Sequence, residues 1–202
     1  MVLKDARSKI EKTWTTTKKF LAAMSVWGLV FSLVTIARLG VAFDYDDTLV
    51  HSEESFAKAA RSVQQVGGPQ YWHIVNNAYD LESPKLLPYG LACLFRGFGF
   101  RILILADRQA GGGDALRKEW RRLAPKGFVF VGAPENKHLH LQDGRFVLFF
   151  GDSDRDILEA KNAGVLGVRV KRGSAATAPP QKAQGNSAPS GRGGATPFRG
   201  RR

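Results

Sequence analysis

Short apolar runs alternate with amphipathic stretches along residues 39–170. The runs are four to six residues long and rich in β-branched and aromatic residues, which is typical of strands buried on both faces. They are residues 39–44, 101–106, 128–131, 146–150 and 167–170. The stretches between them predict helices at 52–66, 71–79, 85–96, 114–123 and 153–163, with Ser52 capping the first. This alternation predicts an α/β fold with a parallel sheet covered by helices on both faces.

One apolar run, residues 20–37, does not fit the alternation. It carries no charge, it follows Lys18 and Lys19, and it approaches the ~20 residues of a membrane span. Because it passes directly into the predicted strand 39–44, cleavage as a signal peptide would damage that strand. A buried helix that starts near Ser25 and packs on the sheet is therefore the favoured structure, with a membrane anchor as the alternative. The lack of a cleavable signal favours the cytoplasm over a periplasmic or membrane-anchored location.

The net charge of +12 belongs to the ends of the chain. Residues 1–19 contribute +4 and residues 171–202 contribute +7, which leaves +1 for the middle. From 173 to 202 the composition is Gly, Ala, Pro and Ser with scattered Arg, which predicts a disordered tail. The expected organisation is a basic segment 1–19, a folded domain 20–172 and the tail 173–202. Such a tail can attract nucleic acid, although a solvated extension is the simpler interpretation.

Cys93 is the only cysteine of the chain and lies in an apolar stretch. It has no partner for an internal disulfide or a zinc site. We therefore expect it to be a small buried hydrophobic residue.

Acidic residues follow two of the predicted strands, and a lysine lies between those strands in the sequence. They are Asp44, Asp46 and Asp47 after the first strand, Asp152, Asp154 and Asp156 after the fourth, and Lys137 between the third and fourth. Any one of these segments alone is typical of a surface loop or a helix cap. Ligands of a parallel α/β sheet bind beyond the carboxyl ends of its strands, so together these side chains indicate one site. Clustered carboxylates repel one another unless a hard cation such as Mg²⁺ lies among them.

The same residue types suit phosphoryl transfer. A carboxylate can attack phosphorus and form an aspartyl-phosphate. A second acid two residues further on can protonate the leaving oxygen. A lysine together with a carboxylate-bound metal can neutralise the charge of the transferring phosphoryl group.

Two of these motifs resemble those of the haloacid dehalogenase superfamily. Residues 44–48 (DYDDT) resemble its first motif, and residues 151–156 (GDSDRD) resemble its fourth. The stretches 151–157 (GDSDRDI) and 71–80 (YWHIVNNAYD) are closer still to the class B bacterial acid phosphatases. The resemblance covers residues 25–172 and implies a Rossmannoid three-layer sandwich with a central parallel sheet and a small helical cap within 51–85.

The resemblance also implies roles for individual residues. Asp44 is then the nucleophile, Asp46 the general acid and base, and Lys137 the brace for the phosphate. The implied cofactor is Mg²⁺, held by Asp44, the main-chain carbonyl of Asp46, Asp152 and Asp156. The implied phosphate- and substrate-binding residues are Thr48, Arg108, Phe56 and Tyr79. For Phe56 and Tyr79 the suggested role is stacking on an aromatic substrate such as a nucleoside, and ordinary packing is the alternative.

The second motif departs from the family. The family has Thr-Gly-Arg where this chain has Ala106-Asp107-Arg108. The hydroxyl that would bind phosphate is lost, and Asp107 adds negative charge beside it. Because losing one such donor costs about 2.7–4 kcal/mol in other enzymes, we expect a slow enzyme or one altered in substrate.

The sequence therefore predicts a Mg²⁺-dependent phosphomonoesterase that acts on small organic phosphates, nucleoside monophosphates among them. The alternative is a catalytically weak member of the fold that binds nucleotides or nucleic acid with its basic tail. A phosphatase tethered to a membrane through residues 20–37 is a third hypothesis. The resemblance also implies a homo-oligomer.

Overall fold

The computed structural model describes residues 2–171, with side chains from residue 13 onward, so the predicted tail 173–202 lies outside the described residues. Its centre is a five-stranded parallel sheet in the order β5-β4-β1-β6-β7. The strands are β1 Gly40–Asp44, β4 Arg101–Ala106, β5 Phe128–Phe130, β6 Phe146–Gly151 and β7 Leu166–Arg169. All five predicted strands are present, and the predicted α/β sandwich with a parallel central sheet is confirmed.

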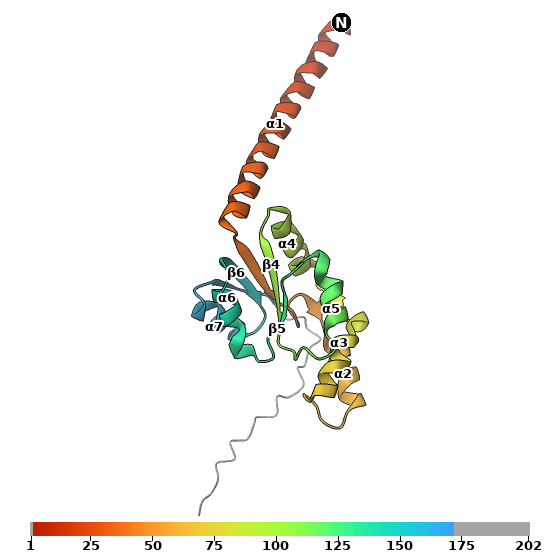
Figure 1. Cartoon of the computed structure of the whole chain (residues 1–202). Helices are drawn as coiled ribbons and strands as arrows, with labels where there is room; N and C mark the ends of the chain where they lie inside the picture. The colour runs from red at the N-terminus through yellow and green to blue at the C-terminus, as the bar shows by residue number, and fades with distance from the viewer. Residues whose placement is uncertain (1, 172–202) are drawn as a thin grey trace, which may run out of the picture.

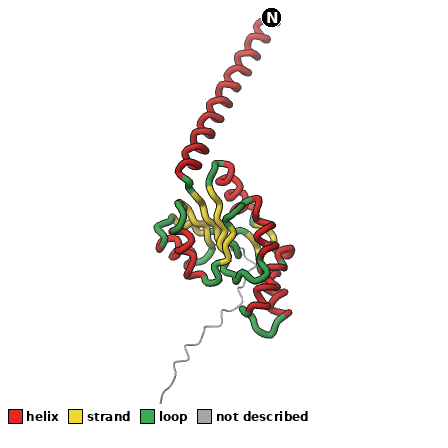
Figure 2. The backbone as a smooth tube through the Cα atoms, in the orientation of Figure 1, coloured by secondary structure: helices red, strands yellow, loops and turns green. Residues whose placement is uncertain are grey.

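Helices cover both faces of the sheet (Figure 2). The α-helices are α1 Val2–Ala37, α2 Glu53–Ser62, α3 Pro69–Asn77, α4 Leu86–Gly97, α5 Asp114–Glu119, α6 Lys137–Gln142 and α7 Asp154–Asn162. The 3₁₀ turns are η1 Tyr79–Leu81, η2 Trp120–Arg122 and η3 Pro134–Asn136. The sequence patterns did not predict α6, nor the two-stranded antiparallel sheet of β2 Val50–His51 and β3 Ser83–Pro84.

The alternation of side chains along β1 and β4 gives the sheet two separate cores. Val41, Phe43 and Ile104 pack on one face against α4 and α5. Ala42 and Leu105 pack on the other face against α6 and α7. Because both faces are buried, the strands read as continuous apolar runs, and this is why their positions could be predicted from the sequence.

Helix α1 overturns the expectation of a buried helix starting near Ser25. It is one continuous helix from Val2, and it stands away from the body (Figure 1). Of residues 13–37 only Val34 is buried, and this segment of 25 residues is long and apolar enough to cross a membrane. The expected boundary near residue 20 falls inside this helix. An apolar run of this kind can pack on a core or enter a bilayer, and hydropathy alone does not separate the two outcomes.

The end of α1 is fixed to the body by a Schellman motif. Arg38 adopts the left-handed conformation (φ 54°), its N–H donates to Thr35 O at 3.1 Å, and the N–H of Leu39 donates to Val34 O at 3.1 Å. Val34 is buried. Gly99 has φ +87°, and a β-carbon there would come within 2.8 Å of Thr35 Oγ1. Two residues, Arg38 and Leu39, therefore join α1 to β1, and both are held in place.

The segment between β2 and β3 contains α2, α3 and η1, and it lies at the end of the sheet opposite α1 (Figure 1). Its small core is formed by Ala59, Tyr71 and Val75. Ser52 precedes α2, but its hydroxyl makes no capping bond, and α2 ends at Ser62 instead of near residue 66. Cys93, on α4, is exposed and not buried as expected.

Candidate active site

Asp44 ends β1, the central strand of the sheet, and its side chain is almost fully buried. The hydroxyl of Thr48 donates to Asp44 Oδ2 at 3.1 Å. The chain can turn back on the strand because Asp47 adopts a left-handed conformation (φ 56°), which Asp tolerates better than most residues. Thr48 was expected to bind phosphate. It lies in the site as expected, but it is fully buried and orients the carboxylate of Asp44.

Lys137 is the centre of the charge cluster. Its Nζ lies 2.6 Å from Asp44 Oδ1, 2.6 Å from Asp156 Oδ1 and 2.8 Å from Asp107 Oδ2. The side chain of Lys137 is 1% exposed, so water screens these contacts little. Lys137 begins α6, and this helix places its side chain under the end of β1. One ammonium group thus holds three carboxylates from three different strand ends.

Asp156 is fixed at the start of α7 by a capping box. Asp156 Oδ2 accepts from the N–H of Ser153 at 3.0 Å and from its hydroxyl at 2.6 Å, while the N–H of Asp156 donates back to Ser153 Oγ at 3.1 Å. A β-carbon on Gly151 would lie 2.3 Å from Asp156 Cβ, so only glycine fits beside it. The fourth motif therefore positions a carboxylate against Lys137.

The buried environment shifts the pKa values of the cluster. Burial raises the pKa of Asp44 well above its usual range, and Lys137 opposes this while the charges of Asp156 and Asp107 add to it. Burial likewise raises the pKa of Asp107 to about 6, against the opposing effect of Lys137. Burial alone would lower the pKa of Lys137, but its three carboxylate partners raise it overall. Asp44 is therefore ionised more easily when further positive charge is nearby.

Three carboxylates form a set that fits a metal ion. Asp44, Asp152 and Asp156 are all buried and offer oxygen atoms within 4.8 Å of one another. With Asp107 they place four carboxylates around the single ammonium of Lys137, and a divalent cation would offset this excess of negative charge. Oxygen donors alone are the set that Mg²⁺ prefers. The residues present thus fit Mg²⁺.

A second cluster holds Asp46, which the sequence predicts as the general acid. Arg108 donates to both carboxylate oxygens of Asp46, with Nε at 3.0 Å from Oδ2, and Arg108 Nη2 also lies 2.6 Å from Glu82 Oε1. The guanidinium stacks on two rings, with its Cζ 4.9 Å from the centroid of Tyr45 and 5.1 Å from that of Phe56. Arg108 is fully buried. It was expected to bind phosphate; its Nε and Nη2 are bound by two carboxylates, while its buried Nη1 has no hydrogen-bond partner among the described residues.

Glu82 connects this cluster to its surroundings. Besides Arg108 it accepts from Ser55 Oγ at 2.8 Å and from the hydroxyl of Tyr45, which in turn accepts from Trp120 Nε1 at 3.2 Å. Burial raises the pKa of Glu82, and Arg108 opposes that shift. No sequence motif marks Glu82, because its role arises only when β2 and β3 pair and Glu82 comes next to Arg108.

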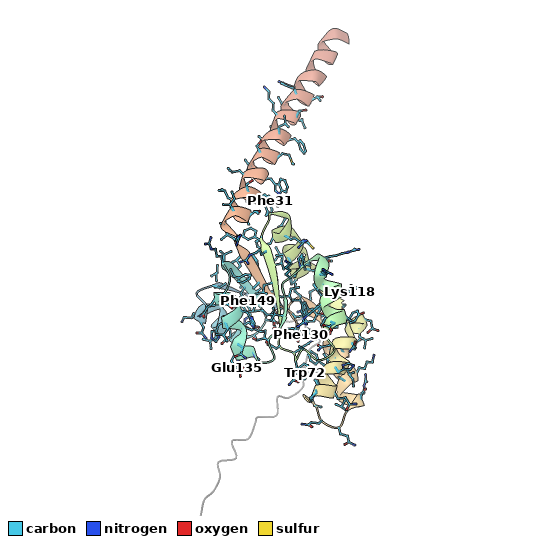
Figure 3. The ribbon with its side chains drawn as sticks, in the orientation of Figure 1. Phe31, Trp72, Lys118, Phe130, Glu135 and Phe149 are labelled. Carbon is cyan, nitrogen blue, oxygen red and sulfur yellow. The ribbon has the colours of Figure 1, made fainter. Side chains whose placement is uncertain are left out.

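The two aromatic residues expected to stack on a substrate lie in different clusters. Phe56 packs against Tyr71 and Trp72 in the segment between β2 and β3, where Figure 3 labels Trp72. Tyr79 packs on the main core, where it lines a cavity of about 450 Å³ with Tyr45 and other residues that do not include Asp44. The ring of Phe56 contacts Arg108, whereas Tyr79 meets the site through its main chain, where its carbonyl accepts from the N–H of Glu82 at 3.1 Å.

The structure therefore brings most of the expected site residues together at the carboxyl ends of β1, β4 and β6. The cluster around the ammonium contains Asp44, Thr48, Lys137, Asp152 and Asp156, and the cluster around the guanidinium contains Asp46, Arg108 and Phe56. Two residues complete these clusters. Asp107, noted in the sequence only as an unfavourable charge, pairs with Lys137, and Glu82 was not predicted.

No protein-family model matches the chain. Among curated proteins it is similar to class B acid phosphatases from several bacteria. It is 28% identical to that of Enterobacter sp. (strain 638) over 76% of this chain and 71% of the relative. It is 28% identical to that of Haemophilus parainfluenzae over 84% and 79%, and 29% identical to that of Klebsiella pneumoniae over 74% and 69%.

Solved structures that resemble it include two hydrolases of the haloacid dehalogenase-like family. One is from Xanthomonas campestris, with 16% identity and a TM-score of 0.47 over 70% of this chain and 87% of that chain. The other is from Streptococcus pneumoniae, with 15% identity and a TM-score of 0.48 over 68% and 87%. The chain is thus similar in sequence to class B acid phosphatases over 74–84% of its length in these three comparisons, and the acidic motifs at the ends of its parallel strands accompany that similarity.

Proposed function

We propose that this chain is a Mg²⁺-dependent phosphomonoesterase in which Asp44 is the nucleophile. As a relative of acid phosphatases it is a phosphoric monoester hydrolase, and the proposal concerns its metal, its residues and its intermediate. The observation that carries the proposal is the buried triangle of Asp44, Asp152 and Asp156 against Lys137 at the end of the central strand. Several buried carboxylates around one ammonium are costly for stability, and such arrangements are concentrated at active sites.

The reaction proceeds in two displacements. An oxygen of Asp44 attacks phosphorus, the bond from phosphorus to the ester oxygen breaks, and Asp46 gives its proton to the leaving alcohol. Water then attacks the phosphorus of the aspartyl-phosphate, Asp46 takes a proton from that water, and inorganic phosphate leaves as the carboxylate of Asp44 is restored. Lys137 favours the ionised form of Asp44 against the effect of burial and faces the negative charge that develops on the phosphoryl oxygens.

Asp44, Asp152 and Asp156, with the carbonyl of Asp46, would hold Mg²⁺. When bound, the ion would supply positive charge that offsets the charge of the phosphoryl oxygens and lowers the pKa of Asp44. Asp156 already binds Lys137 and Ser153, so its main contribution is to hold the ammonium in place. Asp44 and Asp152 would then be the side-chain ligands with the larger share in holding the ion.

We propose that catalysis is slow by the standard of this chemistry. Ala106 is fully buried and offers no hydroxyl, and Arg108 is taken up by Asp46 and Glu82. The hydroxyl contact implied by the resemblance is thus missing, and of the guanidinium of Arg108 only Nη1 has no partner among the described residues. The small organic phosphates and nucleoside monophosphates expected from the sequence are the substrates to screen first.

A stopped-time assay of Asp46→Asn tests the two-step mechanism. p-Nitrophenolate leaves without much help from an acid, whereas hydrolysis of the aspartyl-phosphate needs the base. With Mg²⁺ the variant should therefore release about one equivalent of p-nitrophenol per site in a burst and then slow down. Acid-quenched protein should carry one phosphoryl group, located on Asp44 by mass spectrometry. A burst without phosphoprotein, or phosphate on another residue, would contradict the proposal.

The second candidate function is phosphate-dependent binding with little catalysis, and the missing hydroxyl at Ala106 is the observation that favours it. The basic tail would then bind nucleotides or nucleic acid in a salt-sensitive manner. Deleting residues 173–202 should remove that binding, and unchanged affinity in the truncated protein rules the role out. A homo-oligomer remains a prediction.

We propose further that the exposed helix α1 attaches the enzyme to a membrane. This replaces the cytoplasmic location favoured from the sequence. The support is the helix itself, which is long, apolar and almost entirely uncovered between Thr13 and Ala37.

A further inference from the structure

We propose that α1 crosses a lipid bilayer with its N-terminus on the cytoplasmic side, and that the body lies on the opposite face with its active site directed away from the membrane. The argument uses the surface of α1, the charges that flank it, its junction with β1 and the direction of the sheet. It extends the proposed function by fixing where the site can meet its substrate.

The surface of α1 is apolar along a length that matches a bilayer. At 1.5 Å per residue, the uncharged residues 20–37 extend roughly 27 Å, against a hydrocarbon thickness of ~30 Å, and Lys18 and Lys19 directly precede them. Large apolar side chains on it are more than half exposed; they include Phe20, Leu21, Val26, Leu29, Leu33 and Ile36. An uncovered apolar surface of this length is unfavourable in water. Lipid would cover all of it.

The residues at the two ends of the apolar segment suit the two interfaces of a bilayer. Trp14 lies near the first end with Lys18 over its ring (5.2 Å), an amphipathic pair that fits the headgroup layer. Arg38 lies at the other end. Six lysines and arginines occur in residues 1–19 but only one in residues 38–55. Short basic flanks stay on the cytoplasmic side, so this asymmetry directs the body to the other side.

The junction with the body argues against removal of α1 as a signal sequence. Arg145 Nη1 donates to Ala37 O at 3.2 Å, and Arg101 Nε donates to Arg38 O at 3.1 Å. Together with the Schellman motif, these contacts make the last turn of α1 part of the folded body. Phe31, labelled at this junction in Figure 3, lies beside the loop of Gly99. Cleavage before β1 would remove these contacts.

The direction of β1 sets the orientation of the site. The strand begins at Gly40, next to α1, and ends at Asp44. At ~3.3 Å per residue the strand carries Asp44 roughly 15 Å from the end of α1. The headgroup layer adds only about 5–8 Å to each side of the hydrocarbon. The site therefore opens into the aqueous phase, and, as a consequence that rests on the proposed function, its substrates are water-soluble esters rather than lipids of the same bilayer.

Carbonate extraction of membranes from bacteria that express the full chain tests the insertion. Wild-type protein should stay in the pellet. Val26→Arg with Val30→Arg places two arginines near the middle of the helix and should lower insertion on the order of a thousandfold, moving the protein to the supernatant. The matched control, Leu86→Arg with Leu87→Arg, changes two exposed residues of α4 and should stay in the pellet. Wild-type protein in the supernatant overturns the proposal, whether it is a monomer, an oligomer detected by cross-linking, or a form from which α1 has been cleaved.

Cys93, exposed and unique in the chain, reports the side on which the body lies. A membrane-impermeant maleimide should label it in spheroplasts before they are permeabilised. In a Lys4→Cys, Cys93→Ser variant the new cysteine should react only after permeabilisation. The reverse pattern would overturn the proposed topology.

Depth measurements test the direction of the site without using activity. In a Cys93→Ser background, a fluorophore at Asp143→Cys, in the loop before β6, should be quenched by lipids with spin-labelled headgroups. A fluorophore at Glu135→Cys, in η3 after β5, should not be quenched. Both positions are exposed, and Figure 3 labels Glu135 at the end of the body remote from α1. Equal quenching at the two positions overturns the orientation, whereas an inactive enzyme with the expected quenching would count only against the proposed function.

Discussion

The two ends of the central sheet differ in how their charged side chains are placed. At the carboxyl ends of the strands lie buried charges that bind one another, with Lys137 against Asp44, Asp107 and Asp156. We call this the catalytic end. At the amino ends lie exposed basic residues, Arg38, Arg101, Lys126 and Arg145, which we call the basic end.

The difference indicates at which end of the sheet the stability of the fold depends on its charged side chains. A buried charge at the catalytic end depends on its partner, because removing the partner leaves it desolvated and unpaired. At the basic end the side chains are hydrated, and two of them bind main-chain carbonyls of the α1 junction. Changes at the catalytic end should therefore alter both catalysis and stability, whereas changes at the basic end should affect only how α1 is held.

The largest effect is expected from Asp44→Asn. An amide cannot attack phosphorus, so phosphate release from p-nitrophenyl phosphate with Mg²⁺ should fall on the order of 10⁴-fold or more. Asp114→Asn, at an acid whose side chain is 99% exposed, should keep full activity. If Asp44→Asn retained a few per cent of the activity, the nucleophile would have to be another residue.

Lys137→Met tests how far the stability of the protein depends on the catalytic end. Three carboxylates lose their shared ammonium, and the free energy of unfolding without divalent cations should fall by about 3–5 kcal/mol. Denaturant unfolding measures this loss, and added Mg²⁺ should restore part of it. Lys161→Met on the exposed face of α7 is the control and should change the value little. Equal stability of the two variants would mean that the cluster does not depend on Lys137.

Arg108→Lys tests the second cluster. Lysine keeps the charge but cannot grip Asp46 and Glu82 with a planar fork, so Asp46 should lose its fixed position. We expect kcat to fall about tenfold to a hundredfold with KM nearly unchanged. Arg117→Lys, at an exposed arginine of α5, serves as the control. A rise in KM with an unchanged kcat would instead give Arg108 the phosphate-binding role that the sequence predicts.

The smallest effect is expected at the α1 junction, from Gly99→Ala. Its positive φ and the approach of a β-carbon to Thr35 and Phe31 should lower the free energy of unfolding by about 1–2 kcal/mol. Hydrolysis of soluble esters should not change. Gly90→Ala, inside α4 with open space around it, should raise stability slightly. If both substitutions had the same effect, the junction would not be tightly packed.

The sequence predicts the sheet well because its strands are buried on both faces. A strand such as 101–106 therefore appears in the sequence as a nearly continuous apolar run. It also predicts the location of the site, because the acidic residues directly follow the strands that became β1 and β6. It does not predict α6, which is short and mixes polar with apolar residues, although this helix positions Lys137. Glu82 and the burial of Arg108 depend on contacts between distant segments, which leave no local pattern.

The two-residue connection between α1 and β1 has a mechanical consequence. A long flexible linker would let the body turn freely above a membrane and reach substrates at many heights. Here the main-chain N–H groups of Arg38 and Leu39 are both hydrogen-bonded, so the helix and the sheet move as one rigid body. Any tilt of α1 within a bilayer is passed to the catalytic end, and the distance of Asp44 from the surface stays nearly constant. The thickness of the host membrane, by setting that tilt, would then aim the active site.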